Sequence, residues 1–256
     1  QLSDGRLLVV HNNFWIEAAS YPAGGKLIAM TMLTADGAID TSWGYNGFYP
    51  VAWGPATYNY GGTFHNKVFE CSDGTFILAG GLYLHKISAD GVFVSVRSYA
   101  VVPYFMQQIY DGCWYDDTKT RLILTGSKYS GPTTAYRNNT LAINPADLTT
   151  DTSWATGGTP GLSVQWSVGN VTVPGNIIAG HPVTALYYTS LVDGKNIVRV
   201  SDGFIILHDQ CTAADGYWTL SKVLLDGSAY DTAFGTNGHV LAGYHGFGPV
   251  SYTHLR

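Results

Sequence analysis

The chain has 256 residues, a formal net charge of −5 and only 12% charged residues, against 31 glycines, 18 tyrosines and 7 tryptophans. Many glycines and aromatic residues with few charges are typical of a protein built from strands and turns rather than helices. The scattered Lys and Arg residues form no basic stripe, which argues against nucleic-acid binding. No apolar run approaches the roughly 18 residues that span a bilayer, so we expect no membrane insertion.

The first part of the chain is predicted to contain short strands separated by tight turns. LSDGRLLVV at 2–10 is a polar turn followed by a buried strand, and LIAMTML at 27–33 is the next strand. An Asp-Gly turn follows, in which Gly37 has no Cβ to clash at positive φ. The Asp40 side chain can then accept hydrogen bonds from nearby backbone N–H groups, which leaves Trp43 to point inward as an apolar anchor.

Later parts of the chain repeat this pattern, and the turn sequence around Trp43 has close copies. The second repeat contains CSDGTFILAGG at 71–81, LYLHKI at 82–87 and ISADGVFVSVRSY at 87–99. Of the turn sequence, only Asp90-Gly91 remains in this copy. The third contains YDDTKTRLILTGS at 115–127, NTLAI at 139–143 and NPADLTTDTSWATGG at 144–158. The fourth contains VSDGFIILHD at 200–209, WTLSKVLL at 218–225 and LLDGSAYDTAFGTNGHV at 224–240. We therefore predict four repeats of several short strands each, with Trp43, Trp154 and Phe234 mostly buried between repeats.

The repeated turn sequence resembles that of the delta-60 repeat β-propellers, whose blades carry a DG-x-x-D-x-x-F/W-G-x-x-G signature. Residues 33–47 and 223–238 match it closely, whereas Val94 and Ala155 depart from it in two other copies. The resemblance implies an all-β propeller with about four recognisable blades, part of a longer propeller, and it implies no catalytic residues. We expect one propeller domain over residues 1–249. The ending VSYTHLR at 250–256 resembles a translated adapter sequence of metagenomic gene fragments, so we treat it as a non-native tail.

The reactive residue types give little sign of catalysis, a metal or a cofactor. Cys71, Cys113 and Cys211 are odd in number and lack CxxC spacing, which indicates free thiols rather than zinc ligands or a disulfide framework. No motif of the metalloproteases, serine hydrolases, phosphate-loop enzymes or calcium-binding loops is present.

One polar cluster, His208-Asp209 with Cys211, ends a predicted inner strand, and His11 follows LLVV in a similar place. We interpret these residues as strand-end polar groups that reach solvent or a turn, with a metal or acid–base role as the alternative. His239 and His245 flank another strand and are expected at the surface.

Three segments are longer than hairpin connections need, namely residues 52–62, 128–139 and 169–190, and loops of that length are often functional. They carry the candidate ligand-binding residues Trp53, Tyr58, Tyr60, Tyr129, Tyr136, Tyr187 and Tyr188. Such aromatic, weakly charged surfaces suit a glycan or a protein partner. The sequence thus favours a non-catalytic binding or structural module, extracellular or virion-associated, over the alternative of a propeller enzyme that acts on polysaccharide in a central channel.

Overall fold

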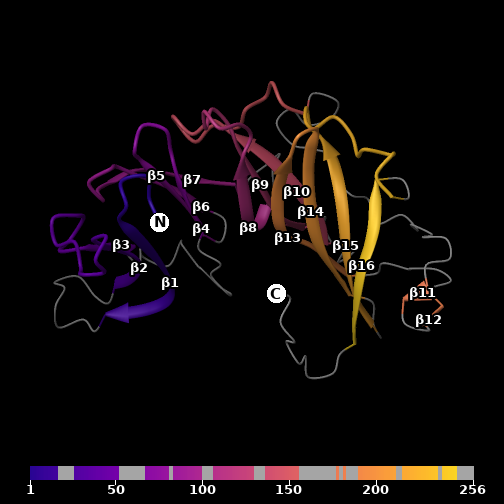
Figure 1. Cartoon of the computed structure of the whole chain (residues 1–256), viewed down its shortest axis with the longest axis horizontal. Coiled ribbons are helices and arrows are strands. Elements are labelled where there is room, and N and C mark those ends of the chain that lie inside the picture. The colour runs from indigo at the N-terminus through magenta and orange to yellow at the C-terminus, as the bar shows by residue number, and fades with distance from the viewer. Residues whose placement is uncertain are drawn as a thin grey trace. The chain divides into compact units, whose positions relative to one another are not determined.

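The computed structural model describes residues 1–16, 26–51, 67–80, 83–99, 106–129, 136–155, 177–178, 181–182, 190–211, 215–235 and 238–246. Within these ranges every regular element is a β-strand, as the sequence predicts (Figure 1). Four antiparallel sheets contain three or four strands each. Contacts divide the chain into two compact units: unit 1 is Gln1–Tyr99 with Pro145–Leu148, and unit 2 is Ala100–Asn144 with Thr149–Arg256.

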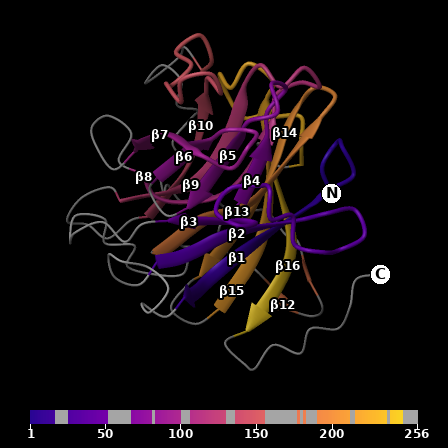
Figure 2. The same ribbon diagram turned by 90° about the vertical axis from the view of Figure 1, so that its left-hand side faces the viewer.

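Unit 1 contains two sheets whose strands follow chain order (Figure 2). The first consists of β1 (Leu7–Ile16), β2 (Lys26–Leu33) and β3 (Phe48–Val51). The second consists of β4 (Lys67–Glu70), β5 (Phe76–Gly80), β6 (Tyr83–Ile87) and β7 (Phe93–Ser98).

Unit 2 repeats this arrangement with a three-stranded and a four-stranded sheet. The three-stranded sheet consists of β8 (Met106–Trp114), β9 (Leu122–Tyr129) and β10 (Tyr136–Ile143). The four-stranded sheet consists of β13 (Ser190–Val200), β14 (Gly203–Cys211), β15 (Asp215–Leu224) and β16 (His239–Gly246). A short pair, β11 (Ile177–Ile178) with β12 (His181–Pro182), lies between them in the chain.

The repeated turns have the conformation that the sequence predicts. Gly37, Gly91 and Gly227 adopt φ values of 89°, 78° and 71°, which favour glycine. In the third copy Leu148 adopts a φ of 60° at the equivalent place. The Asp side chains also act as predicted, because the Oδ1 atoms of Asp40 and Asp151 accept hydrogen bonds from the backbone N–H two residues later, at 3.2 and 2.9 Å.

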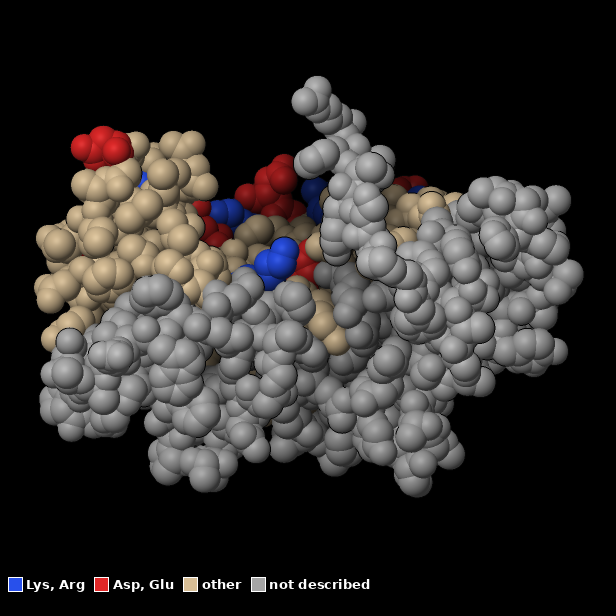
Figure 3. Space-filling model, turned by 90° about the horizontal axis from the view of Figure 1, so that it is seen from below, with Lys and Arg blue, Asp and Glu red and all other residues tan. Residues whose placement is uncertain are grey.

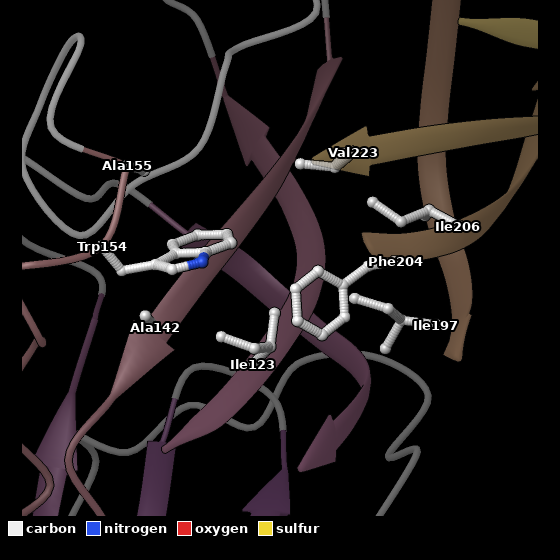
Figure 4. Close-up of a cluster of buried hydrophobic side chains, with 8 residues drawn as sticks. All are labelled: Ile123, Ala142, Trp154, Ala155, Ile197, Phe204, Ile206 and Val223. Atoms are coloured by element: carbon white, nitrogen blue, oxygen red, sulfur yellow. The ribbon is translucent and has the colours of Figure 1, made fainter. Parts of the chain in front are cut away.

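Each unit has an apolar core in which a turn tryptophan lies on a strand phenylalanine. In unit 1, Trp43 meets Phe76 edge-on, with ring centroids 6.3 Å apart and an angle of 82°. In unit 2, Trp154 meets Phe204 at 6.3 Å and 80° (Figure 4). Both tryptophans are 1% exposed, which confirms their predicted burial. Phe234, predicted to be mostly buried, is partly buried.

Three further expectations change once the structure is known. Strands β4, β8 and β13 precede the predicted inner strands and were not predicted, because their sequences lack a regular apolar alternation. Segment 128–139 is a hairpin end rather than a long loop, since β9 continues to Tyr129 and β10 begins at Tyr136. His208 and His239, expected near the surface, are 0% and 8% exposed.

Candidate functional site

Each unit has two distinct ends. In unit 1 the Asp-Gly turns lie at one end of both sheets, where Trp43 reaches Ala89. The strand ends that flank residues 17–25, 52–66 and 81–82 lie at the opposite end, as their registers show. Unit 2 has the same division, and the Tyr129–Tyr136 pair lies opposite its Asp-Gly turns. We call the end opposite the Asp-Gly turns the loop end of each unit.

Most of the predicted ligand-binding aromatic residues lie outside the described residues, namely Trp53, Tyr58, Tyr60, Tyr187 and Tyr188. Tyr129 and Tyr136 are described at the backbone level only. They are register partners in the last and first positions of β9 and β10. The structure thus brings these two positions together at the loop end of unit 2, and whether the others join them stays a prediction.

A row of buried polar side chains crosses the four-stranded sheet of unit 2. His208 of β14 pairs in register with Thr219 of β15, and Ser221, two residues further along β15, pairs with His239 of β16. All four side chains are at least nine-tenths buried. We call this set the histidine layer. The Ser221 Oγ and His239 Nδ1 atoms are 2.8 Å apart, and the Tyr230 ring lies 4.7 Å from the His239 ring.

Burial keeps both histidines of the layer neutral at physiological pH. Desolvation lowers the pKa of His208 to about 3, with a further contribution from the nearby His239. Desolvation also lowers the pKa of His239 to about 4. A serine hydrogen-bonded to a neutral histidine is the arrangement that activates nucleophiles in hydrolases. Ser221 is 0% exposed, however, so a substrate cannot reach its Oγ in this conformation.

A second buried polar group connects the two sheets of unit 2. Asp111 of β8 is 8% exposed. Its Oδ2 atom accepts hydrogen bonds from the Asn196 side chain at 3.1 Å and from the Ile197 N–H at 3.3 Å. Thr125 and Thr140 are buried beside it in register on β9 and β10. Asp111 thereby ties β13 to β8, which is a structural use of this carboxylate.

The turn carboxylates are also engaged in structural contacts. A hydrogen bond from Ser42 and another from Arg6 hold the pKa of Asp40 below its usual range, against the opposing effect of burial. Arg121 and Lys222 make the corresponding ion pairs with Asp151 and Asp231, at 2.5 and 2.8 Å. Basic side chains consequently lie next to acidic ones on the face shown in Figure 3, most of whose described surface is uncharged.

The remaining reactive residues form no obvious centre in the described part of the chain. Cys71 is buried and Cys113 is partly buried, and burial raises the pKa of the Cys113 thiol to about 12. His11 lies 2.7 Å from the Thr31 hydroxyl in unit 1. The described residues contain no group of three His, Cys, Asp or Glu side chains placed to hold a metal ion. The side chains of Asp209, Cys211 and His245 lie outside the described set.

Among the described residues there is no helix with the length and apolar character needed to cross a bilayer. No protein-family model matches the sequence, and no curated protein matches it significantly.

Proposed function

We propose that the chain is a non-catalytic β-propeller module that presents aromatic-rich loops to a glycan or protein partner. The observation that carries this proposal is the division of each unit into two ends. At one end, turn carboxylates and turn tryptophans are committed to structural contacts, such as Asp151 with Arg121 and Trp154 with Leu225. The strand ends at the loop end border sequence segments that are long and rich in Trp and Tyr, such as 52–62 after β3 and 169–190 before β13.

Several features of the fold support a propeller scaffold for this module. Its sheets are antiparallel, contain three or four strands in sequential order, and pack face to face through matching tryptophan contacts in both units. The turn sequence resembles that of delta-60 repeat propellers. Propellers hold their connections on a rigid support, so loops at one end can act as a binding surface.

The alternative is a propeller enzyme that cleaves polysaccharide. Such an enzyme would need two carboxyl groups on either side of the scissile bond. Within the described residues, Asp111 is the carboxylate that is buried, and its contacts with Asn196 and Ile197 hold two sheets together. The binding module therefore explains the described side chains better.

The proposal can be tested on a glycan array, followed by titration of any glycan that binds. The double variant Tyr58→Ala, Tyr60→Ala should weaken binding by more than about 2 kcal/mol, as is common for aromatic contact residues, while the unfolding midpoint stays unchanged. Tyr45→Ala is a matched control, because Tyr45 is an exposed tyrosine beside the Asp-Gly turns rather than at the loop end. Equal binding by the double variant and the wild type would reject the loop end as the binding surface. Turnover of a polysaccharide would favour the enzyme.

A further inference from the structure

Two turns of the repeated sequence are each capped by a tryptophan from the preceding repeat. The Trp43 indole N–H donates to the Ala89 carbonyl at 3.0 Å, and the Trp154 indole N–H donates to the Leu225 carbonyl at 3.0 Å. Both carbonyls belong to the residue before the Asp of an Asp-Gly turn. The rings lie directly on these turns, because a Cβ atom built on the turn glycine would come within 2.7 Å of the ring in each case. The tryptophan thus satisfies one carbonyl of the turn and covers its glycine.

The equivalent turn of the third repeat is capped differently, since the second repeat lacks the tryptophan of the turn sequence. Here Ala146 is the residue before the Asp. The Lys86 ammonium donates to the Ala146 carbonyl at 2.7 Å and to the Pro145 carbonyl at 3.0 Å. The buried Tyr99 hydroxyl donates to the carbonyl of Leu148, the residue in the place of the glycine. At this turn an ammonium group therefore serves the carbonyl that an indole N–H serves elsewhere, and a phenol serves a second one.

The lysine-capped turn lies where the chain passes between the two compact units. Residues 145–148, which we call the strap, belong to unit 1, although the residues on both sides of them belong to unit 2. Lys86 and Tyr99, which hold three carbonyls of the strap, are residues of unit 1 as well. Each tryptophan-capped turn, in contrast, lies with its tryptophan and its flanking residues in one unit. The change of cap therefore coincides with the change of unit.

Two features make the strap easier to open than a tryptophan-capped turn. Opening a tryptophan-capped turn exposes a large aromatic ring to water, which is unfavourable. The Lys86 ammonium instead regains water when the strap opens, because ammonium groups are strongly hydrated and Lys86 is only 8% exposed in the closed state. Leu148 also adopts a φ of 60°, which is unfavourable for a residue with a Cβ atom. The main opposing effect is the loss of burial of the Leu148 side chain, which is 0% exposed.

We propose that residues 145–148 are a releasable strap, which Lys86 and Tyr99 hold closed on unit 1. Its release breaks three hydrogen bonds and removes from unit 1 the segment that the chain after Tyr99 contributes. The two donors act together, because they hold carbonyls of one short turn and the loss of either favours release from the other. Acylation of the Lys86 amine removes its charge and its donor capacity, so this modification would keep the strap open.

Brief labelling of the intact chain with an N-hydroxysuccinimide ester tests this proposal, because the Lys86 amine is accessible to the ester only when the strap is open. Mass spectrometry of the labelled peptides gives a rate for each lysine. Tyr99→Phe removes one hydrogen bond to the strap and should raise the rate at Lys86 about tenfold. Lys222 is the internal control, since it also lies four residues before the Asp of its turn, and its partners are Asp202 and Asp231. Its rate should be the same in both chains.

A second pair of variants tests the ammonium group itself. Lys86→Met keeps the length of the side chain but removes the donor, and Lys222→Met makes the same change at the control position. Hydrogen exchange of the Asn144 amide, which donates to the Thr149 carbonyl across the strap at 2.8 Å, should be at least about tenfold faster in Lys86→Met and unchanged in Lys222→Met. Wild-type exchange at Asn144 in Lys86→Met would overturn the proposal. An acylation rate at Lys86 that Tyr99→Phe leaves unchanged, or that rises equally at Lys222, would overturn it as well.

Discussion

Single residues of the turn sequence have two structural roles at once. Gly91 must adopt a positive φ of 78°, and it must also leave room for the Trp43 ring, which belongs to a turn more than forty residues earlier. The first requirement follows from the Asp-Gly pair itself. The second could not be predicted, because it depends on which segment packs on the turn.

Two glycine variants separate these roles. Gly74→Ala and Gly91→Ala both place a Cβ at a φ of 78°, but a Cβ at Gly74 would have only Ala89 Cβ at an ordinary 3.7 Å. We expect Gly74→Ala to cost about 1–2 kcal/mol through backbone strain. Gly91→Ala should cost about 1–3 kcal/mol more, because the added methyl overlaps the Trp43 ring. Urea denaturation gives both values, and equal losses for the two variants would contradict the close approach.

The indole contact of Trp154 can be divided in a similar way. Trp154→Phe should cost about 1–3 kcal/mol, because it removes the N–H that the Leu225 carbonyl accepts and part of the ring. Trp154→Ala should cost about 3–5 kcal/mol, as for other buried aromatic side chains. Val198→Ala serves as the control, since Val198 is 55% exposed in the same unit and should change stability little. The free energy of unfolding in denaturant checks the order of the three.

At the level of elements, the four-stranded sheet of unit 2 contains a polar layer within an apolar fold. The apolar face that Phe204 and Ile206 contribute to the core is interrupted by four buried polar residues, His208, Thr219, Ser221 and His239. Both histidines have a folded-state pKa well below that of an unfolded chain, about 3 and about 4 against 6.5. The sheet is therefore the acid-sensitive element of the unit.

The sign of this sensitivity follows from proton binding. As the pH falls below about 6.5, the unfolded chain takes up protons at these histidines before the folded chain does, so stability falls. Each histidine should contribute up to about 1.4 kcal/mol per pH unit between pH 6 and 4.5. The turn carboxylates, with lowered pKa values, lose their contribution only below about pH 4. His208→Leu should reduce the slope of unfolding free energy against pH in this interval, and an unchanged slope would reject the assignment.

The sequence allowed the repeated strands and turns to be predicted, because their Asp-Gly pairs and apolar runs are local signals. Strands β2 and β15 lie where the apolar runs place them. Strand β13 was missed, since SLVDGKNIVRV reads as a mixture of turn and strand residues. The histidine layer was also missed. His208 is buried because the strand register places neighbouring strands beside it, and this register cannot be read from the local sequence. The hydrogen bond from the Tyr99 hydroxyl to the Leu148 carbonyl could not be predicted for the same reason.

For the whole molecule, stability should be distributed by unit. The core around Trp43 and the core around Trp154 each contain residues of one unit. We expect Trp43→Ala to accelerate backbone hydrogen exchange mainly in β1, β2 and β5, and Trp154→Ala to do so mainly in β9, β10 and β14. Mass spectrometry of peptides from both variants measures this. Equal acceleration in both units by either variant would show that the cores do not act separately.

The fit of tryptophan on glycine also has an evolutionary consequence. Where a turn carries glycine, at positions 91 and 227, the covering residue is tryptophan, and where the third turn carries Leu148, the covering residue is Tyr99. A mutation in one repeat therefore changes which residues are acceptable in its neighbour, so the repeats cannot diverge independently. In related chains the covering aromatic residue and the turn residue beneath it should covary as a pair across adjacent repeats, more strongly than either varies with other positions of its own repeat.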